Sequence, residues 1–296
     1  MVENNEVAPT VLADIQKRYR VWSLPKRTPI SVRFPVLVPV VLFVRRRVRA
    51  MSNQQKYRKV YAAVTSDRYP VIQYGSQSLL RRRLGAADPR LQEGKITNLK
   101  QAIPHISYVV IKPGEVFSLW KLLGNTTYAR GYVDGMVLSS GRVGIGPGGG
   151  LCQLANLLHW VFLHTDMTVV ERFHHSYDVF PDNGRTLPFG SGATIFYNAI
   201  DLKVQNTSSI AWQIVVWLDD DYVYAEVRTE GAAPLHYKIK EAHHHFISTK
   251  KMIFRYNQIW RRSTNAKGEE VSHEYLFTNF APVLYPVAPE KITVTL

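Results

Sequence analysis

The segment from Leu151 to Leu163 constrains the fold more than any other, because apolar side chains occupy nearly every face of a helix drawn through it. A helix without a polar face cannot lie at a surface, so we expect it to be buried in a core. The run of glycines from Gly146 to Gly150 comes directly before it, with Pro147 inside the run, and favours a sharp turn into the helix. The sequence therefore predicts one large core built around this helix.

The C-terminal third is typical of antiparallel β-structure, with β-branched and aromatic runs separated by turn residues. Shorter strands and helices are also expected before this region, and all predicted elements are given together. The expected strands are 108–111, 168–173, 195–204, 211–218, 222–228, 253–262 and 270–277. Residues 94–104 are expected to form a short helix and residues 117–124 a short helix or turn. The fold class predicted is α+β: an antiparallel sheet packed on a buried central helix that starts at the single cysteine, with a basic N-terminal extension.

The predicted domain organisation has two parts. Residues 1–104 form a basic, Pro-interrupted and partly helical N-terminal region, and residues 105–296 form an α+β domain. Within that domain, residues 113–206 carry the core motif and residues 207–296 form C-terminal β-hairpins. A chain of 296 residues with 46% hydrophobic content is long enough for this arrangement.

The positive charge is concentrated near the N-terminus. Residues 1–100 contain 20 Lys and Arg against 6 Asp and Glu, which accounts for the entire net charge of +14. A basic extension indicates an acidic partner such as a lipid head group or a cell-wall polymer. Nucleic acid is not expected, because no zinc finger, basic zipper or aromatic-interleaved RNA motif is present.

The most apolar run within this region extends from Phe34 to Val44 and ends in the basic segment Arg45 to Arg49. Two interpretations compete. One is a buried extended segment followed by a solvated basic helix face; the other is a surface anchor on anionic lipid. Because Pro35 and Pro39 interrupt any amphipathic stripe, we favour the first. The stretch 53–86 is expected to be partly helical.

The single cysteine, Cys152, excludes an intramolecular disulfide and a Cys-rich zinc site. Together with a polar, acidic N-terminus that lacks the features of a secretory signal, this composition predicts a cytoplasmic protein, with a peripheral position at the inner face of the membrane as the alternative. Neither a metal ion nor a cofactor is expected.

Cys152 falls in the first turn of the central helix, where free backbone N–H groups and the helix dipole favour a thiolate. The same donors could hold an oxyanion or a bound carboxylate. The sequence therefore predicts a site at the start of this helix. The expected binding residues are Gly148, Gly149, Gly150, Gln153, Trp120 and Ser176.

A base is available at a suitable distance along the chain. A helix of about twelve residues spans ~18 Å, and a returning strand of about seven residues spans ~23 Å, so the chain comes back near the level of Cys152 at His174 and His175. His175 is the preferred base, and His174 is the alternative. The residue that would orient the imidazole stays open, and its candidates are Asp178, Asp182, Asn198 and Asp201.

A lone cysteine is also often an inert, small hydrophobic residue. Two classes of function therefore remain open. The first is a thiol acyltransferase or amidase that uses Cys152 and a histidine. The second is a non-catalytic protein that binds a carboxylate, or acts as an accessory protein at the membrane surface.

Several motifs between residues 112 and 206 resemble the VanW-like family of vancomycin-resistance accessory proteins. They are Lys112–Trp120 (KPGEVFSLW), Tyr132–Gly135 (YVDG), Gly148–Gln153 (GGGLCQ), Phe162–Thr165 (FLHT), Glu171–His175 (ERFHH) and Ile200–Asn206 (IDLKVQN). The resemblance implies a role in glycopeptide resistance or the cell envelope, with a peptidoglycan precursor or peptide as the expected partner, and it brings no particular reaction with it. Family members often have an Asp-Ala-Thr step after the histidines. Here Gly192 takes the acidic position, which makes a binding role more plausible.

Overall fold

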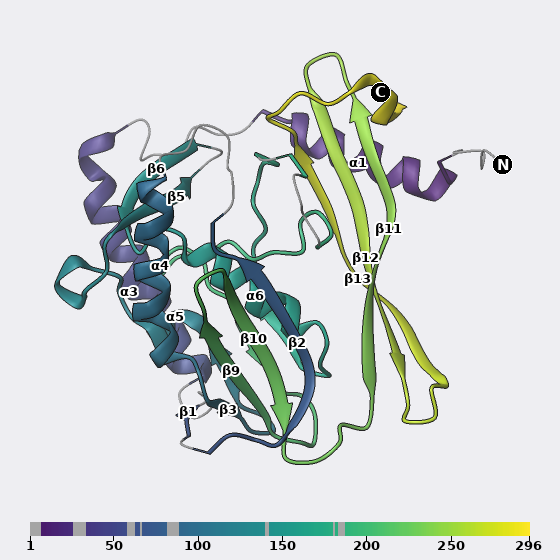
Figure 1. The fold of residues 1–296 in the computed structure, drawn as a ribbon. Helices are drawn as coiled ribbons and strands as arrows, with labels where there is room; N and C mark the ends of the chain where they lie inside the picture. The colour runs from purple at the N-terminus through teal and green to yellow at the C-terminus, as the bar shows by residue number, and fades with distance from the viewer. Residues whose placement is uncertain are drawn as a thin grey trace.

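The computed structural model describes residues 7–25, 34–57, 63–65, 67–81, 89–139, 142–179, 181–182 and 187–296. These residues form an α+β fold with several antiparallel sheets, which confirms the predicted fold class (Figure 1). Within these ranges, no helix has both the length and the apolar character needed to cross a membrane.

A five-stranded antiparallel sheet forms the centre of the molecule. Its strands are β1 (Ala63–Val64), β2 (Val71–Leu79), β3 (Val109–Ile111), β9 (Trp212–Leu218) and β10 (Tyr222–Thr229), in the order β1-β3-β9-β10-β2. Helix α6 (Leu151–Phe162) packs against β2 and β10 (Figure 1). Its side chains Leu154, Leu158 and Phe162 are fully buried, as an all-apolar helix requires.

Smaller elements surround α6. A three-stranded sheet has the order β4-β8-β7, with β4 (Val116–Ser118), β8 (Lys203–Gln205) and β7 (Thr168–Glu171). The hairpin of β5 (Asp134–Ser139) and β6 (Arg142–Pro147) packs on α4 (Arg90–Ala102), and the short α5 (Leu119–Leu123) follows β4 directly. The remaining short helices are 3-10 turns at Pro35–Leu37, Ile103–His105, Tyr128–Arg130 and Pro289–Lys291.

A second large sheet is built from the C-terminal residues. Its order is β13 (Glu270–Pro282), β12 (Ile253–Thr264), β11 (His236–Ser248) and β14 (Ile292–Thr295), with β14 parallel to β11. The N-terminal helix α1 (Pro9–Ser23) crosses this sheet near the C-terminus of the chain (Figure 1). Val11 and Ile15 of α1 form a separate hydrophobic cluster with Phe254 and Tyr256 of β12.

The structure corrects three predictions. Residues 38–57 form a continuous helix, α3, whereas an extended segment was favoured for the apolar run 34–44 and a helix only for the basic residues after it; Pro39 is tolerated because it lies in the first turn, where its missing N–H is not needed. Residues 71–79 form β2 where helix was expected, because pairing with the distant β10 outweighs local propensity. The strand expected over 195–204 is reduced to a bridge between Phe196 and Ile200 and the short β8.

Candidate functional site

The Gly-rich turn before α6 is closed by backbone packing. A Cβ atom on Gly149 would overlap the backbone of Gly135, and one on Gly150 would overlap the side chain of Lys95. The side chain of Asn98 donates a hydrogen bond of 2.9 Å to the carbonyl of Gly149. These glycines allow α4, β5 and the start of α6 to approach closely. This close packing is by itself a reason for glycine at these positions, so a bound ligand is not needed to explain them.

Other predicted binding residues also have partners within the protein. The side-chain amide of Gln153 donates to Ser78 Oγ at 2.8 Å and to the carbonyl of Leu79 at 2.7 Å. The indole nitrogen of Trp120 donates to the carbonyl of Ile200 at 2.8 Å. Gly148 faces the side chain of Thr126, and Ser176 is exposed. Their role in ligand binding stays a prediction.

Cys152 is the second residue of α6 and packs against the hydrophobic core. Burial raises the pKa of its thiol above the usual value, and a hydrogen bond with the backbone of Ile195 offsets part of this effect. This direction disfavours a thiolate at the start of α6, because desolvation destabilises the charged form. A catalytic role of Cys152 stays a prediction.

His174 and His175 are both partly buried, and burial lowers the pKa of each ring, that of His174 to about 4. The charges of Arg172, His175 and Arg18 add to the effect on His174. Arg18 belongs to α1, so His174 lies on the side of the C-terminal sheet. Among the described residues, neither ring forms a hydrogen bond with Cys152, and the catalytic pairing stays a prediction.

The residues proposed to orient a histidine have other partners. Asp201 accepts hydrogen bonds from Ser118 Oγ at 2.6 Å and from the backbone N–H of Trp120 at 3.1 Å, which fixes the start of α5. Burial raises the pKa of Asp201 to about 6, against the effect of these hydrogen bonds. Asn198 adopts a positive φ of 54° in the loop before β8.

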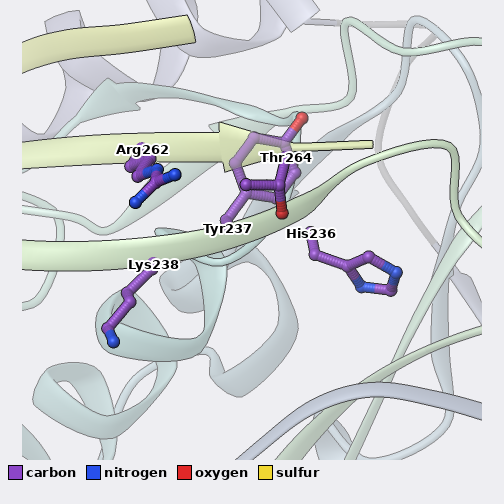
Figure 2. A pocket seen from close by; sticks show the side chains of 5 residues that line it. All are labelled: His236, Tyr237, Lys238, Arg262 and Thr264. Atoms are coloured by element: carbon purple, nitrogen blue, oxygen red, sulfur yellow. The ribbon is translucent and has the colours of Figure 1, made fainter. Parts of the chain in front are cut away.

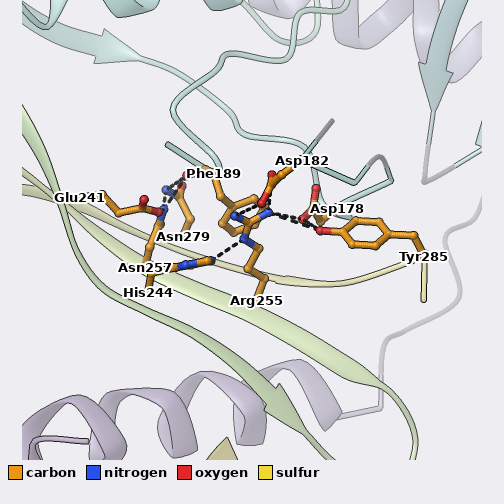
Figure 3. A network of polar contacts seen from close by, with 9 residues as sticks. All are labelled: Asp178, Asp182, Phe189, Glu241, His244, Arg255, Asn257, Asn279 and Tyr285. Atoms are coloured by element: carbon orange, nitrogen blue, oxygen red, sulfur yellow. Dashed lines mark hydrogen bonds and ion pairs between the residues drawn. The ribbon is translucent and has the colours of Figure 1, made fainter. Parts of the chain in front are cut away.

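Asp178 and Asp182 instead belong to a polar network on the C-terminal sheet. Arg255 of β12 donates to both oxygens of Asp182, at 2.8 and 2.7 Å, and to Asp178 at 3.2 Å (Figure 3). Its guanidinium also lies 4.9 Å from the ring centroid of Phe189. Tyr285 donates to Asp178 at 2.7 Å. The segment that follows His175 is thereby fixed to the C-terminal sheet.

Gly192, which takes the acidic position of the family motif, lies against α6. A Cβ atom there would overlap the side-chain amide of Asn156, whose oxygen accepts a hydrogen bond of 2.7 Å from the N–H of Ala193. Nearby, Nδ1 of His159 lies 2.6 Å from the carbonyl of Ser191, and its Nε2 is buried without a hydrogen-bond partner in the described structure. Burial is the main reason that the pKa of His159 falls to about 3.

A basic groove lies between α3 and the β7–β8 region. The cavity has a volume of about 630 Å³. We define the basic groove by its lining residues, which are Leu42, Val44, Arg45, Arg46, Val48, Arg49, Ser52, Asn53, Lys56, Val170, Glu171, Asn198, Ala199 and Lys203. It contains five basic side chains and a single carboxylate, so its potential is positive.

An ion-pair network forms the floor of the basic groove. Lys203 is 1% exposed and donates to Glu171 at 3.0 Å and to Asn53 of α3 at 2.6 Å. Glu171 also pairs with Arg49 and accepts from the backbone N–H of Asp201 at 2.9 Å. Burial acts to raise the pKa of Glu171, but these partners outweigh it and leave the pKa below its usual value. Glu171 is thus part of a structural ion-pair network.

Arg46 is the groove residue best placed to receive an anion. Its Nε atom is buried and has no hydrogen-bond partner among the described residues. Its guanidinium carbon lies 5.8 Å from the centroid of the Tyr197 ring. A buried guanidinium nitrogen without an acceptor is costly, and a bound carboxylate or phosphate would supply one.

A second, smaller cavity of about 210 Å³ lies on the C-terminal sheet. It is lined by His236, Tyr237 and Lys238 of β11 and by Arg262 and Thr264 of β12. Figure 2 shows Tyr237 on the opposite side of β11 from His236 and Lys238, as strand geometry requires. None of these residues was singled out from the sequence, and they do not include any residue of the predicted cysteine site.

Sequence reasoning missed the basic groove because its parts come from distant segments. Asn53 and Lys203, which meet in it, are 150 residues apart. The run of arginines after Phe34–Val44 was the available signal, but the favoured interpretation gave it a solvated face.

Comparison with known proteins places the chain in a family. A family model described as VanW like protein matches residues 94–228. The vancomycin B-type resistance protein VanW of Enterococcus faecalis is 31% identical over 270 residues, which cover 90% of this chain and 98% of that protein. The uncharacterized protein YoaR of Bacillus subtilis is 28% identical over 109 residues, which cover 37% of this chain and 34% of that protein. No solved structure matches the chain. The chain therefore belongs to the VanW-like family, which is associated with vancomycin resistance.

Proposed function

We propose that this protein is a non-catalytic accessory protein of the cell envelope that binds an anionic, peptidoglycan-type ligand in the basic groove. The observation that carries the proposal is the buried, unpartnered Nε of Arg46 in a groove with five basic side chains and one carboxylate. The association of the family with vancomycin resistance makes a cell-wall precursor the natural ligand class.

The chemistry of the basic groove favours a carboxylate or a phosphate. Arginine presents a planar set of donors that matches both groups, and hydrogen bonds to a charged acceptor are about twice as strong as neutral ones. The volume of about 630 Å³ falls in the range of small-molecule sites. Peptidoglycan precursors carry both groups, as the C-terminal carboxylate of the stem peptide and the pyrophosphate of the nucleotide.

Binding is favoured over catalysis by the state of the predicted catalytic groups. Burial raises the pKa of the Cys152 thiol, which disfavours the thiolate, and burial also lowers the pKa of the His175 ring. An activated cysteine needs a thiolate or a base within hydrogen-bond reach. A thiol acyltransferase or amidase that uses Cys152 and His175 therefore stays the alternative, and it requires the two side chains to move together.

The test is calorimetric titration of the full chain with UDP-N-acetylmuramyl pentapeptide at 0.15 M salt. Separate titrations with inorganic pyrophosphate and with acetyl-Lys-D-Ala-D-Ala distinguish phosphate from carboxylate recognition. Arg46→Gln is expected to weaken binding about tenfold or more, because one charge-assisted hydrogen-bond donor is lost. Arg47→Gln is the matched control: it removes the same charge from the next residue of α3, which does not line the basic groove.

Two results would contradict the proposal. One is a wild-type protein that binds none of the three probes. The other is an equal loss of affinity in Arg46→Gln and Arg47→Gln, which would indicate a diffuse charge effect. Release of a cleaved or transferred peptide by the wild type, abolished in Cys152→Ser, would favour the thiol enzyme instead.

A further inference from the structure

Helix α3 is oriented with its apolar side toward solvent. Val40, Phe43, Val44, Val48 and Met51 are all exposed, and Met51 reaches 70% exposure. Val36, in the 3-10 turn before the helix, is 87% exposed. Soluble proteins rarely leave a contiguous apolar surface of this kind uncovered.

The exposed side chains form a continuous stripe. Val36, Val40, Val44 and Val48 recur every four residues, and Phe43 and Met51 lie beside them on the same helical face. We call these six residues the α3 apolar stripe. The opposite face holds the helix to the protein through polar contacts, because Arg49 pairs with Glu171 and Asn53 accepts from Lys203.

We infer that the α3 apolar stripe inserts into the surface of an anionic lipid bilayer and holds the protein there. Helices that lie in a membrane interface have this composition: an apolar face that enters the acyl boundary and flanking basic residues that meet the lipid phosphates. The inference goes beyond the proposed function. Val44 and Val48 belong to both the stripe and the lining of the basic groove, whereas Val40, Phe43 and Met51 do not line the groove, so substitutions at Val40 and Met51 test the stripe separately.

The charges around the stripe fit a lipid surface. Residues 34–57 contain five basic residues and no Asp or Glu. Arg47 lies within the stripe, and its guanidinium carbon is 5.2 Å from the ring centroid of Phe43, so its stem can follow the apolar surface while its head reaches phosphate. Each basic residue near an anionic surface contributes to binding.

The same charges disfavour two other ways of covering the α3 apolar stripe, which are contact with a second copy of the chain and insertion across the membrane. A second copy of the chain would bring two sets of arginines into close contact across the stripe, and like charges repel there. The five basic residues also prevent α3 from spanning the membrane, so the helix would lie parallel to its surface. In Figure 1, α3 lies on the side of the molecule away from β11–β13, which leaves it accessible to a flat surface.

Vesicle flotation of the full chain tests the inference. The vesicles are phosphatidylcholine alone, or phosphatidylcholine with about a third phosphatidylglycerol, each at low and high salt. The test variant is Val40→Gln with Met51→Gln, which makes the stripe polar without changing charge. The control is Val271→Gln with Leu284→Gln, two exposed apolar residues on the C-terminal part of the chain.

The wild type is expected to float with the anionic vesicles, less at high salt, and not with phosphatidylcholine alone. The stripe variant should partition about a hundredfold more weakly, because it removes two inserted apolar side chains and each costs roughly a factor of ten. The control variant should behave as wild type, and unchanged circular dichroism would show that both variants fold. Absence of wild-type flotation at low salt, equal flotation of the stripe variant, or a lipid-free dimer that the stripe variant abolishes would overturn the inference.

Discussion

The side-chain nitrogen of Lys203 lies 3.0 Å from a carboxylate oxygen of Glu171, beneath helix α3, which begins far upstream at Val38. Because Lys203 is 1% exposed, its charge depends on partners within the protein. This pair holds α3 against the β7–β8 sheet and sets the floor of the basic groove.

Replacing Glu171 by Gln should therefore destabilise the protein. The change leaves the buried ammonium of Lys203 and the guanidinium of Arg49 without their carboxylate, and breaking one side of a buried pair costs about 3 kcal/mol or more. Urea unfolding followed by circular dichroism measures the loss. Glu93→Gln, which breaks a well-exposed pair with Arg81, serves as the control and should leave stability close to that of the wild type, because solvent screens such pairs. Similar losses in both variants would show that the Glu171 network contributes little.

Stability should fall as the pH drops from 7 to 5, and His159 is a principal cause. Burial lowers the pKa of His159 from the usual 6.5 to about 3, so below pH 6.5 the unfolded chain binds a proton that the folded chain does not. The resulting loss is about 2 kcal/mol at pH 5. His164, with its pKa lowered by burial to about 4, acts in the same direction.

Urea unfolding at several pH values checks this dependence. In His159→Gln the difference in unfolding free energy between pH 7 and pH 5 should shrink by about 2 kcal/mol. The exposed His273→Gln should retain the wild-type difference. An unchanged difference in His159→Gln would mean that this ring titrates in the folded protein.

Cys152 should react slowly with iodoacetamide in the folded protein. Burial raises the pKa of the thiol, so the reactive thiolate is scarce near neutral pH. At pH 7.5 its rate constant should be at least about tenfold below that of glutathione, and unfolding in urea should restore ordinary reactivity. Fast alkylation with an inflection below pH ~8.5 would instead support the pairing of Cys152 with a histidine.

Gly149→Ala should strongly destabilise the fold or prevent it, because the added Cβ atom would overlap the backbone of Gly135. Backbone atoms of two packed elements cannot shift cheaply, so the cost is expected to exceed about 3 kcal/mol. Gly231→Ala is the matched control, since its Cβ atom would meet nothing within 4 Å. Thermal unfolding compares the two. A stable Gly149→Ala protein that has lost ligand binding would indicate that the glycine turn is a binding site after all.

The sequence predicted those elements whose signals are local. Helix α6 was predicted because its residues are apolar on nearly every face, and β9 and β10 were predicted because their β-branched and aromatic runs are separated by turn residues. Strand β2 was missed because its partner β10 lies about 150 residues away, and its own residues, which include Gly75 and several polar ones, have weak strand propensity.

The predicted site shows the same limit. The lengths of a helix and of the strand that follows it predict how far along the helix axis the returning residues lie. They do not predict on which side of the helix the returning strand runs. Cys152 bonds to the backbone of Ile195, whereas the chain beyond His175 turns to the C-terminal sheet, where Arg255 holds Asp178. The basic groove could not be predicted at all, because it needs α3 to be placed against β8.

The pairing of β2 with β10 has a practical consequence for any attempt to isolate the part of the protein that defines its family. A fragment cut at residues 94 and 228 ends inside β10 and omits β2 altogether. Strand β10 would then be an exposed edge strand, with its N–H and C=O groups toward β2 left unpaired. Val223 and Val227 of this strand, which are buried in the intact chain, would lie at that edge. An exposed edge strand of this kind pairs with strands of other molecules, which leads to aggregation. The fragment 94–228 is thus expected to precipitate when expressed alone, and a soluble version must start upstream of Val71.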